Sequence, residues 1–402
     1  MNHLQEEQHF TLDQLHGTNV SRSDALARLH AFVPCVPKYR ATRNYTRNQD
    51  GSASTSELSP FVTTRLLLES ELTDAVLERY AYSTVEKFIQ EVCWRTYWKG
   101  WLEMRPEVWY DYQSDLNACH QILREDDALN ERYMEALRGE TGLACFDAWV
   151  EELTQTGFLH NHVRMWFASI WTFTLQLPWP LGAALFLHHL LDGDAASNTL
   201  SWRWVAGIQT RGKHYLARAS NIEKYTHGQF NPAGDLNEHA LPIHDERVYT
   251  ERRTLSFTTP STGPRYALWL HPEECRADQQ WLEKFNITRI ATGVPKELHY
   301  LTDGSPSTER FRQAACADAA HRINAELING QSLATWFAST GADRLLVPYA
   351  AVGPVQDLLS NQSDLPVSTV TRTWDSTLWP HATAGFFRFK KHLPTFFKLA
   401  TL

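Results

Sequence analysis

Four residues that could hold a planar, charged ligand fall on one face of a predicted helix around residues 88–98. Glu91, Trp94, Arg95 and Trp98 occupy positions i, i+3, i+4 and i+7, so their side chains share one stripe. Arginine can bind an anion through two hydrogen bonds, indoles can stack on a flat ring, and a carboxylate can accept hydrogen bonds. Taken alone, however, the stripe is explained more simply as an ordinary helix face with core indoles and a Glu–Arg pair.

A second cluster of polar residues lies in the segment "LHNHVRMW", at the start of an apolar stretch. His160 and Arg164 are one helical turn apart, and polar groups at the start of a buried helix must reach water or find partners. Asp192 or Asp194 in "LLDGDAASNTLSWRW" could neutralise Arg164, and a polar ligand could add hydrogen bonds to such a buried pair. A metal site at His160 and His162 is not expected, because residues two apart on a helix point in different directions.

The segment "GSASTSELSPF" (51–61) precedes another expected helix start at Ser59 and Pro60. Hydroxyl groups and free backbone N–H groups at a helix N-terminus can bind phosphate. A plain serine N-cap with a polar lead-in fits the same residues.

The elements that must position these residues change character along the chain. Helical patterns continue to about residue 235, and a charged, Ser/Thr/Pro-rich stretch at 236–262 predicts a linker. From 263 to 402 short strands at 265–271, 287–292, 343–349 and 367–372 alternate with helices, which is typical of a parallel α/β domain. No GxGxxG or GxxxxGK[ST] motif marks this half as a nucleotide binder.

Bulk properties exclude several classes of protein. A net charge of −8 argues against a generally basic nucleic-acid coat, so a polyanion would need a local basic groove. Six scattered cysteines favour free thiols in a reducing cytoplasm over a disulfide framework or a metal centre. The apolar stretch 166–191 is interrupted by Gln176, Pro178 and Pro180, which favours two buried helices over a membrane span.

Several motifs in order resemble the flavin-binding helical domain of the photolyase/cryptochrome family. They are "NYTRN", "TSELSPF", "EVCWRTYWKGW", "TGFLHNHVRMW" and "LLDGDAASNTLSWRW", and the resemblance covers roughly residues 20 to 235. It implies a multidomain fold in which an all-helical FAD-binding domain is followed by a parallel α/β, Rossmann-like antenna-type domain. Because the family places the α/β domain first, we expect a circular permutation, with domains at 1–235 and 263–402.

The resemblance also implies FAD as the cofactor and assigns residues to it. Arg164 would pair with Asp192 beside the flavin ring, and Asn198 would face its N5 atom. The expected FAD-binding residues are Tyr45, Thr55, Ser56, Leu58, Ser59, Glu91, Arg95, Asn161, Arg164, Asp192, Asp194 and Asn198. Whether a second, light-harvesting chromophore binds is left open.

By the same resemblance the protein would split cyclobutane pyrimidine dimers in UV-damaged DNA by electron transfer from reduced flavin. The catalytic residues would be Glu91, Asn198, Trp202 and Trp179, the last two as inner members of an electron-transfer chain. The dimer would contact Trp94, Asn161, Met165 and Trp204. A blue-light photoreceptor without repair activity is the alternative, and a third is a flavoprotein with other redox chemistry.

Some features depart from the family pattern. His162 replaces a frequent arginine, and the outer tryptophan of the chain has no clear counterpart near 125–135, so electrons would stop short or leave through a ring such as Trp171. DNA phosphates could be bound by a basic segment, although a solvated loop is equally consistent with it; its residues are Arg211, Lys213, His214, Arg218 and Lys224.

Overall fold

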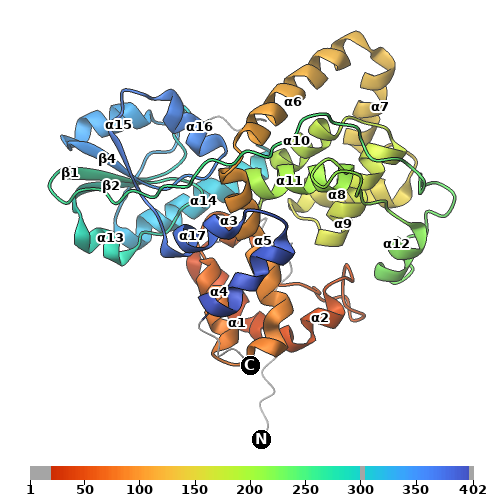
Figure 1. The fold of residues 1–402 in the computed structure, drawn as a ribbon, viewed down its shortest axis with the longest axis horizontal. Helices are drawn as coiled ribbons and strands as arrows, with labels where there is room; N and C mark the ends of the chain where they lie inside the picture. The colour runs from red at the N-terminus through yellow and green to blue at the C-terminus, as the bar shows by residue number, and fades with distance from the viewer. Residues whose placement is uncertain (1–19, 299–303, 398–402) are drawn as a thin grey trace, which may run out of the picture.

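The computed structural model describes residues 20–298 and 304–397 of the chain. Helices alone build its first part (Figure 1). They are α1 (Arg22–Phe32), α2 (Tyr39–Thr42), α3 (Ser59–Thr63), α4 (Glu69–Leu77), α5 (Tyr82–Glu103), α6 (Glu107–Glu125), α7 (Asp127–Arg138), α8 (Ala144–Thr156), α9 (Asn161–Ser169), α10 (Trp179–His189), α11 (Ala195–Ala206) and α12 (Ala219–Tyr225). A 3₁₀ segment at Val33–Lys38 and a π-helical turn at Ile170–Thr174 complete this part.

The helical part has two apolar cores that meet at α5. One core gathers side chains of α6 to α11, and the other gathers those of α1, α3, α4 and α5. Trp98 and Trp101 of α5 pack against both cores. This helix therefore lies at the boundary where the candidate site is built.

The second part is a parallel sheet covered by helices on both faces. Its strands are β1 (Arg265–Leu270), β2 (Asn286–Thr292), β3 (Glu326–Leu327), β4 (Arg344–Pro348) and β5 (Val367–Val370), in the order β3-β2-β1-β4-β5. The helices are α13 (Gln279–Lys284), α14 (Pro306–Ile323), α15 (Leu333–Thr340) and α16 (Pro354–Asn361).

Strand β1 shows why both faces are covered, because its side chains alternate between two cores. Ala267 and Trp269 join the core under α15 and α16, and Tyr266 and Leu268 join the core over α13. Figure 1 shows α15 and α16 on one side of the sheet and α13 and α14 on the other. The fold class expected from the sequence is confirmed. The two-residue strand β3 is not among the strands that the sequence predicted.

The expected linker packs along the helical part of the protein. In Figure 1 the green chain after α12 runs across α10 and α11 towards β1. Arg253 pairs with the fully buried Glu103 at 2.5 Å, Arg247 pairs with Asp115 at 2.7 Å, and Tyr249 donates to Asp111 at 2.6 Å. These contacts attach the segment to α5 and α6.

The C-terminal helices pack on the first helices of the chain. They are α17 (Thr373–Leu378), α18 (Phe386–Phe389) and α19 (Leu393–Phe396), with 3₁₀ turns at Trp379–His381 and Lys390–His392. Their buried residues belong to the core of α1, α4 and α5. We therefore propose that the α/β unit ends near residue 372 and not at the expected boundary of 402.

The six cysteines of the chain are free thiols. Among the described residues, helices are too short or too polar to cross a bilayer.

Candidate functional site

The segment between α10 and α11 forms the floor of the candidate site. Asp192 is 6% exposed and accepts a hydrogen bond from Arg164 of α9 at 3.0 Å. Burial opposes ionisation of this carboxyl, but Arg164 and Arg95 outweigh it and hold the pKa of Asp192 below its usual value. The pairing of Arg164 with Asp192 expected from the sequence is present.

Asp194 is held by two cations from α5. Its carboxylate lies 2.7 Å from Lys99 Nζ and 3.7 Å from Arg95 Nη1, and it also caps α11 by accepting from the N–H of Ser197. Burial acts against the charge, yet Lys99 and Arg95 keep the pKa of Asp194 well below its usual value. An ionised carboxylate therefore sits at the start of α11.

His160 sets the start of α9, which carries Arg164. Its Nδ1 accepts from the N–H of His162, and its Nε2 contacts the carbonyl oxygen of Arg43 at 3.0 Å. Burial is the main reason that the pKa of His160 falls to about 3. The neutral ring thus caps the helix.

A pH titration should reveal this cap. The unfolded chain binds a proton at His160 near pH 6.5 and the folded protein only near pH 3, so stability is complete above pH 6.5 and declines as the pH falls. At pH 5 the loss from this group is about 2 kcal/mol. Urea unfolding of His160→Asn at pH 7 and pH 5 should show a smaller decline than the wild type. The exposed His244→Asn should behave like the wild type, and equal declines in all three proteins would contradict the assignment.

The α5 stripe does not act as one unit. Glu91 pairs with Arg43 at 3.0 Å and with Lys87 at 2.8 Å, whereas Arg95 turns to Asp194. The expected Glu–Arg pair within the stripe is therefore absent, because Glu91 and Arg95 each pair with other residues. Trp94 stacks on Phe386 of α18, with ring centroids 3.8 Å apart.

The residues expected to meet a substrate differ in exposure from those expected to meet the flavin. Glu91, Trp94, Met165 and Trp204 are half-buried and Asn161 is exposed. Asn161 donates weakly to Met165 Sδ at 3.8 Å, and Trp204 stacks on Tyr215. In contrast, Asp192, Asp194, Asn198 and Trp202 are 2 to 8% exposed. Asn198 donates to the carbonyl oxygen of Ala183 at 2.8 Å.

The expected phosphate-binding residues lie in two places. Tyr45 stacks on His227 at 4.6 Å beside α12, and its carbonyl oxygen accepts from Ser54. Thr55, Ser56 and Ser59 are half-buried and Leu58 is buried at the N-terminus of α3. Since α3 is a single turn of 5 residues, its dipole is small, and free hydroxyl and N–H groups would have to do the binding. Thr63 of the same turn donates to the carbonyl oxygen of Asp192 at 3.3 Å, which joins α3 to the floor.

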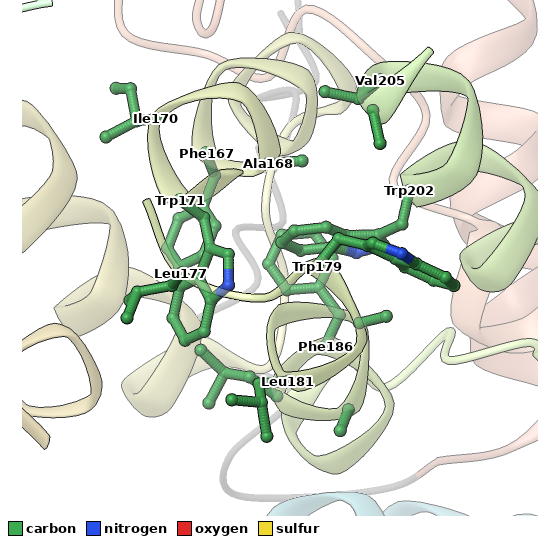
Figure 2. Close-up of a cluster of buried hydrophobic side chains, with 14 of the residues drawn as sticks. Phe167, Ala168, Ile170, Trp171, Leu177, Trp179, Leu181, Phe186, Trp202 and Val205 are labelled. Atoms are coloured by element: carbon green, nitrogen blue, oxygen red, sulfur yellow. The ribbon is translucent and has the colours of Figure 1, made fainter. Parts of the chain in front are cut away.

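The tryptophans expected to carry electrons lie in one buried cluster (Figure 2). Trp202 of α11 meets Trp171 edge-on at 6.4 Å, and Trp179 of α10 stacks on Tyr112 of α6 at 5.5 Å. Tyr112 in turn contacts Trp109 at 5.6 Å, and the indole N–H of Trp109 donates to Asp357 of α16. The cluster thus continues from the floor in two directions, through Trp171 and through Tyr112.

The basic segment after α11 is only partly free. Arg211 donates to backbone carbonyl groups of residues 245–247, and His214 contacts the carbonyl oxygen of Ala240. Lys213, Arg218 and Lys224 remain exposed. The segment therefore offers three of the five expected side chains to a ligand.

Sequence reasoning missed Lys99 and Phe386. Lys99 follows Glu91 and Arg95 at the same four-residue spacing, so the periodicity alone could have added it to the stripe. Phe386 contacts Trp94 through the tertiary fold, and the local sequence does not predict that contact.

Together these elements form a helical domain that contains the buried polar floor and the cluster of tryptophan side chains. A family profile described as "FAD binding domain of DNA photolyase" matches residues 88–245. Deoxyribodipyrimidine photo-lyase of Streptomyces griseus is 35% identical over 158 residues, which are 39% of this chain and 33% of the relative. The enzyme of the same name from Thermus thermophilus is 34% identical over 201 residues, 48% of this chain and 44% of the relative.

Among solved structures, a cryptochrome of Synechocystis is 26% identical, covers 52% of this chain and 44% of its own, and has a TM-score of 0.42. The chain thus matches less than half the length of these relatives. Residues 88–245 of the helical part are thus similar to the FAD-binding domain of DNA photolyase, and this similarity supports FAD as the cofactor.

The residues at the floor fit a polar cofactor. Arg95 Nη1, Ser197 Oγ, Thr199 Oγ1 and Trp202 Nε1 are buried and make no hydrogen bond within the described residues. Burying a polar atom without a partner is costly, so a ligand with carbonyl, hydroxyl or ring nitrogen groups would stabilise this region.

Proposed function

We propose that the protein repairs cyclobutane pyrimidine dimers in DNA by light-driven electron transfer. The observation that carries this proposal is the split in exposure within one site. The floor that would hold FAD is buried, whereas the side chains that would meet a lesion are half-buried or exposed.

Bound FAD would supply light absorption and one-electron transfer, and the chain would position the reactants. Arg164 and Asp192 would help to hold the flavin ring, and Asp194 with its two cations would fix the start of α11. Glu91, which pairs with Arg43 and Lys87, would accept hydrogen bonds from the flipped-out bases. Trp94 and Trp204 would flank them, and extrusion costs less for a damaged pair because its stacking and pairing are already weakened.

We also propose that the domain order is a circular permutation of the family's order. In support, the first described residues and the last ones pack on the same core, since Val20 and Phe397 both contact it. Segments that pack on one core can be joined in a different order without loss of the fold.

The decisive experiment illuminates the reduced, FAD-loaded protein with a dimer-containing oligonucleotide and follows dimer loss by chromatography. We expect repair in blue light and none in the dark. Glu91→Gln should keep its FAD and lower the repair rate about tenfold, because the amide offers one acceptor oxygen in place of two and would orient the bases less well. The exposed Glu78→Gln is the matched control. Bound, reducible FAD without repair by the wild type would instead support the photoreceptor alternative.

A further inference from the structure

A cationic strip lies near the C-terminus, in a protein whose net charge is −8. We define it as Phe387, Arg388, Lys390, Lys391 and His392, at the end of α18 and in the following 3₁₀ turn. Phe387 is 75% exposed, Arg388, Lys391 and His392 are exposed, and Lys390 is half-buried. No aspartate or glutamate occurs in the sequence after Asp375. The segment therefore carries positive charge that its own sequence does not neutralise.

The strip is fixed to the helix that carries the proposed lesion-binding residues. Phe386, immediately before it, is 4% exposed and stacks on Trp94 with an interplanar angle of 11°. Phe389, inside it, is fully buried and packs on Tyr97 at 5.6 Å. In Figure 1 the dark-blue C-terminal chain lies across α5. Buried aromatic rings thus alternate with exposed cations, and the rings hold the cations at the edge of the site.

Among the described residues, the cationic side chains of the strip form no ion pair with a carboxylate. Arginines of comparable exposure elsewhere pair with carboxylates, as Arg247 does with Asp115 and Arg289 does with Glu326. Lys390 lies over the ring of Phe387 at 5.6 Å, and His392 stacks on His381 at 3.9 Å.

Further positive charge lies close by. Arg105 donates to the carbonyl oxygen of Thr383 at 3.0 Å, just before the strip. Burial, helped by the charge of Arg252, lowers the pKa of Arg105, so two arginines lie near each other at this place. Lys87 and Arg43 pair with Glu91, which precedes Trp94 by three residues on α5.

We propose that this strip binds the phosphate backbone of DNA next to the lesion, with Phe387 stacking on an unpaired base. The proposal rests on the proposed function. Free, solvent-accessible cations attract phosphates and release counterions, and an exposed ring stacks on any base without sequence preference. A strip anchored at Trp94 would hold the strand beside the bases that Trp94 would contact.

The test measures binding of the FAD-loaded full chain to a fluorescent duplex with one thymine dimer, by anisotropy, between 50 and 200 mM salt. Arg388→Gln/Lys391→Gln should bind about tenfold more weakly at 100 mM salt, and the slope of log K against log salt should fall by about 1.8. The matched control is Arg124→Gln/Arg132→Gln, two exposed arginines on α6 and α7. It should bind within about twofold of the wild type if the effect is local.

FAD content and melting temperature verify that both double variants are folded. If Arg388→Gln/Lys391→Gln leaves affinity and salt slope unchanged, the proposal that the strip binds DNA is overturned. Dimer repair by the wild type would still support the proposed function. An equal loss in both double variants also overturns it, because net charge alone would then explain the effect. A wild type that binds FAD but neither binds nor repairs the duplex overturns both proposals.

Discussion

Lys99→Met is expected to lower the free energy of unfolding by about 3 kcal/mol and to abolish retention of FAD. The variant keeps the length of the side chain but leaves the carboxylate of Asp194, which is 6% exposed, with one cation at 3.7 Å. Removing one member of a buried ion pair typically costs about 3–5 kcal/mol, because the other charge stays buried and uncompensated. The N–H of Ser197 and Arg95 remain as partners, which places the expectation at the lower end.

Urea unfolding and the ratio of flavin to protein absorbance after gel filtration measure the two effects. Lys87→Met is the control, since Lys87 makes a half-exposed pair with Glu91 one turn away in sequence. Such pairs contribute about 0.5 kcal/mol or less. If Lys99→Met were as stable as Lys87→Met and retained FAD, Asp194 would not depend on Lys99.

Gly182→Ala is expected to destabilise the protein by about 1–3 kcal/mol, although alanine normally stabilises a helix interior by roughly 0.5–1 kcal/mol. The added Cβ would lie 2.3 Å from Cη2 of Trp202 and 2.9 Å from Nε1 of Trp171. Neither indole can retreat easily, because Trp171 is fully buried and Trp202 is 2% exposed in the cluster of Figure 2. The rings must move apart, so the proposed electron transfer to flavin should also slow.

Thermal unfolding measures the first effect, and the rate of flavin photoreduction in the presence of a reductant measures the second. Gly263→Ala is the control, because a Cβ there meets no atom within 4 Å. A stabilised Gly182→Ala protein with the wild-type photoreduction rate would show that the two indoles are not in contact across α10.

The helices and most strands were predictable because their signals are local. The α5 stripe follows the helical period, and the strands at 265–271 and 343–349 are short apolar runs between helices. The resemblance of "LLDGDAASNTLSWRW" to a flavin-binding segment led to Asp192 and Asp194, and Arg164 was a partner of opposite charge in the same half of the chain. Strand β3 was not predictable, since two residues carry no period.

The partners of the α5 side chains were not predictable from their spacing. On an isolated helix Glu91 and Arg95 would pair at i, i+4. In the fold, Arg95 and Lys99 face the buried Asp194, and Glu91 is left to Arg43 and Lys87. A buried carboxylate attracts cations more strongly than an exposed one, because the surrounding dielectric constant is lower. Burial therefore decided the pairing, and burial is a property of the tertiary structure.

The sequence by itself determined which segments become helices or strands and where the polar floor lies in the chain. Those features depend on residues a few positions apart. Only the tertiary structure decided that the C-terminal segment "GFFRFKK" lies on α5 and stacks Phe386 on Trp94. That contact joins residues 292 positions apart in the sequence, and it forms because burying the rings of Phe386 and Phe389 against α5 removes apolar surface from water.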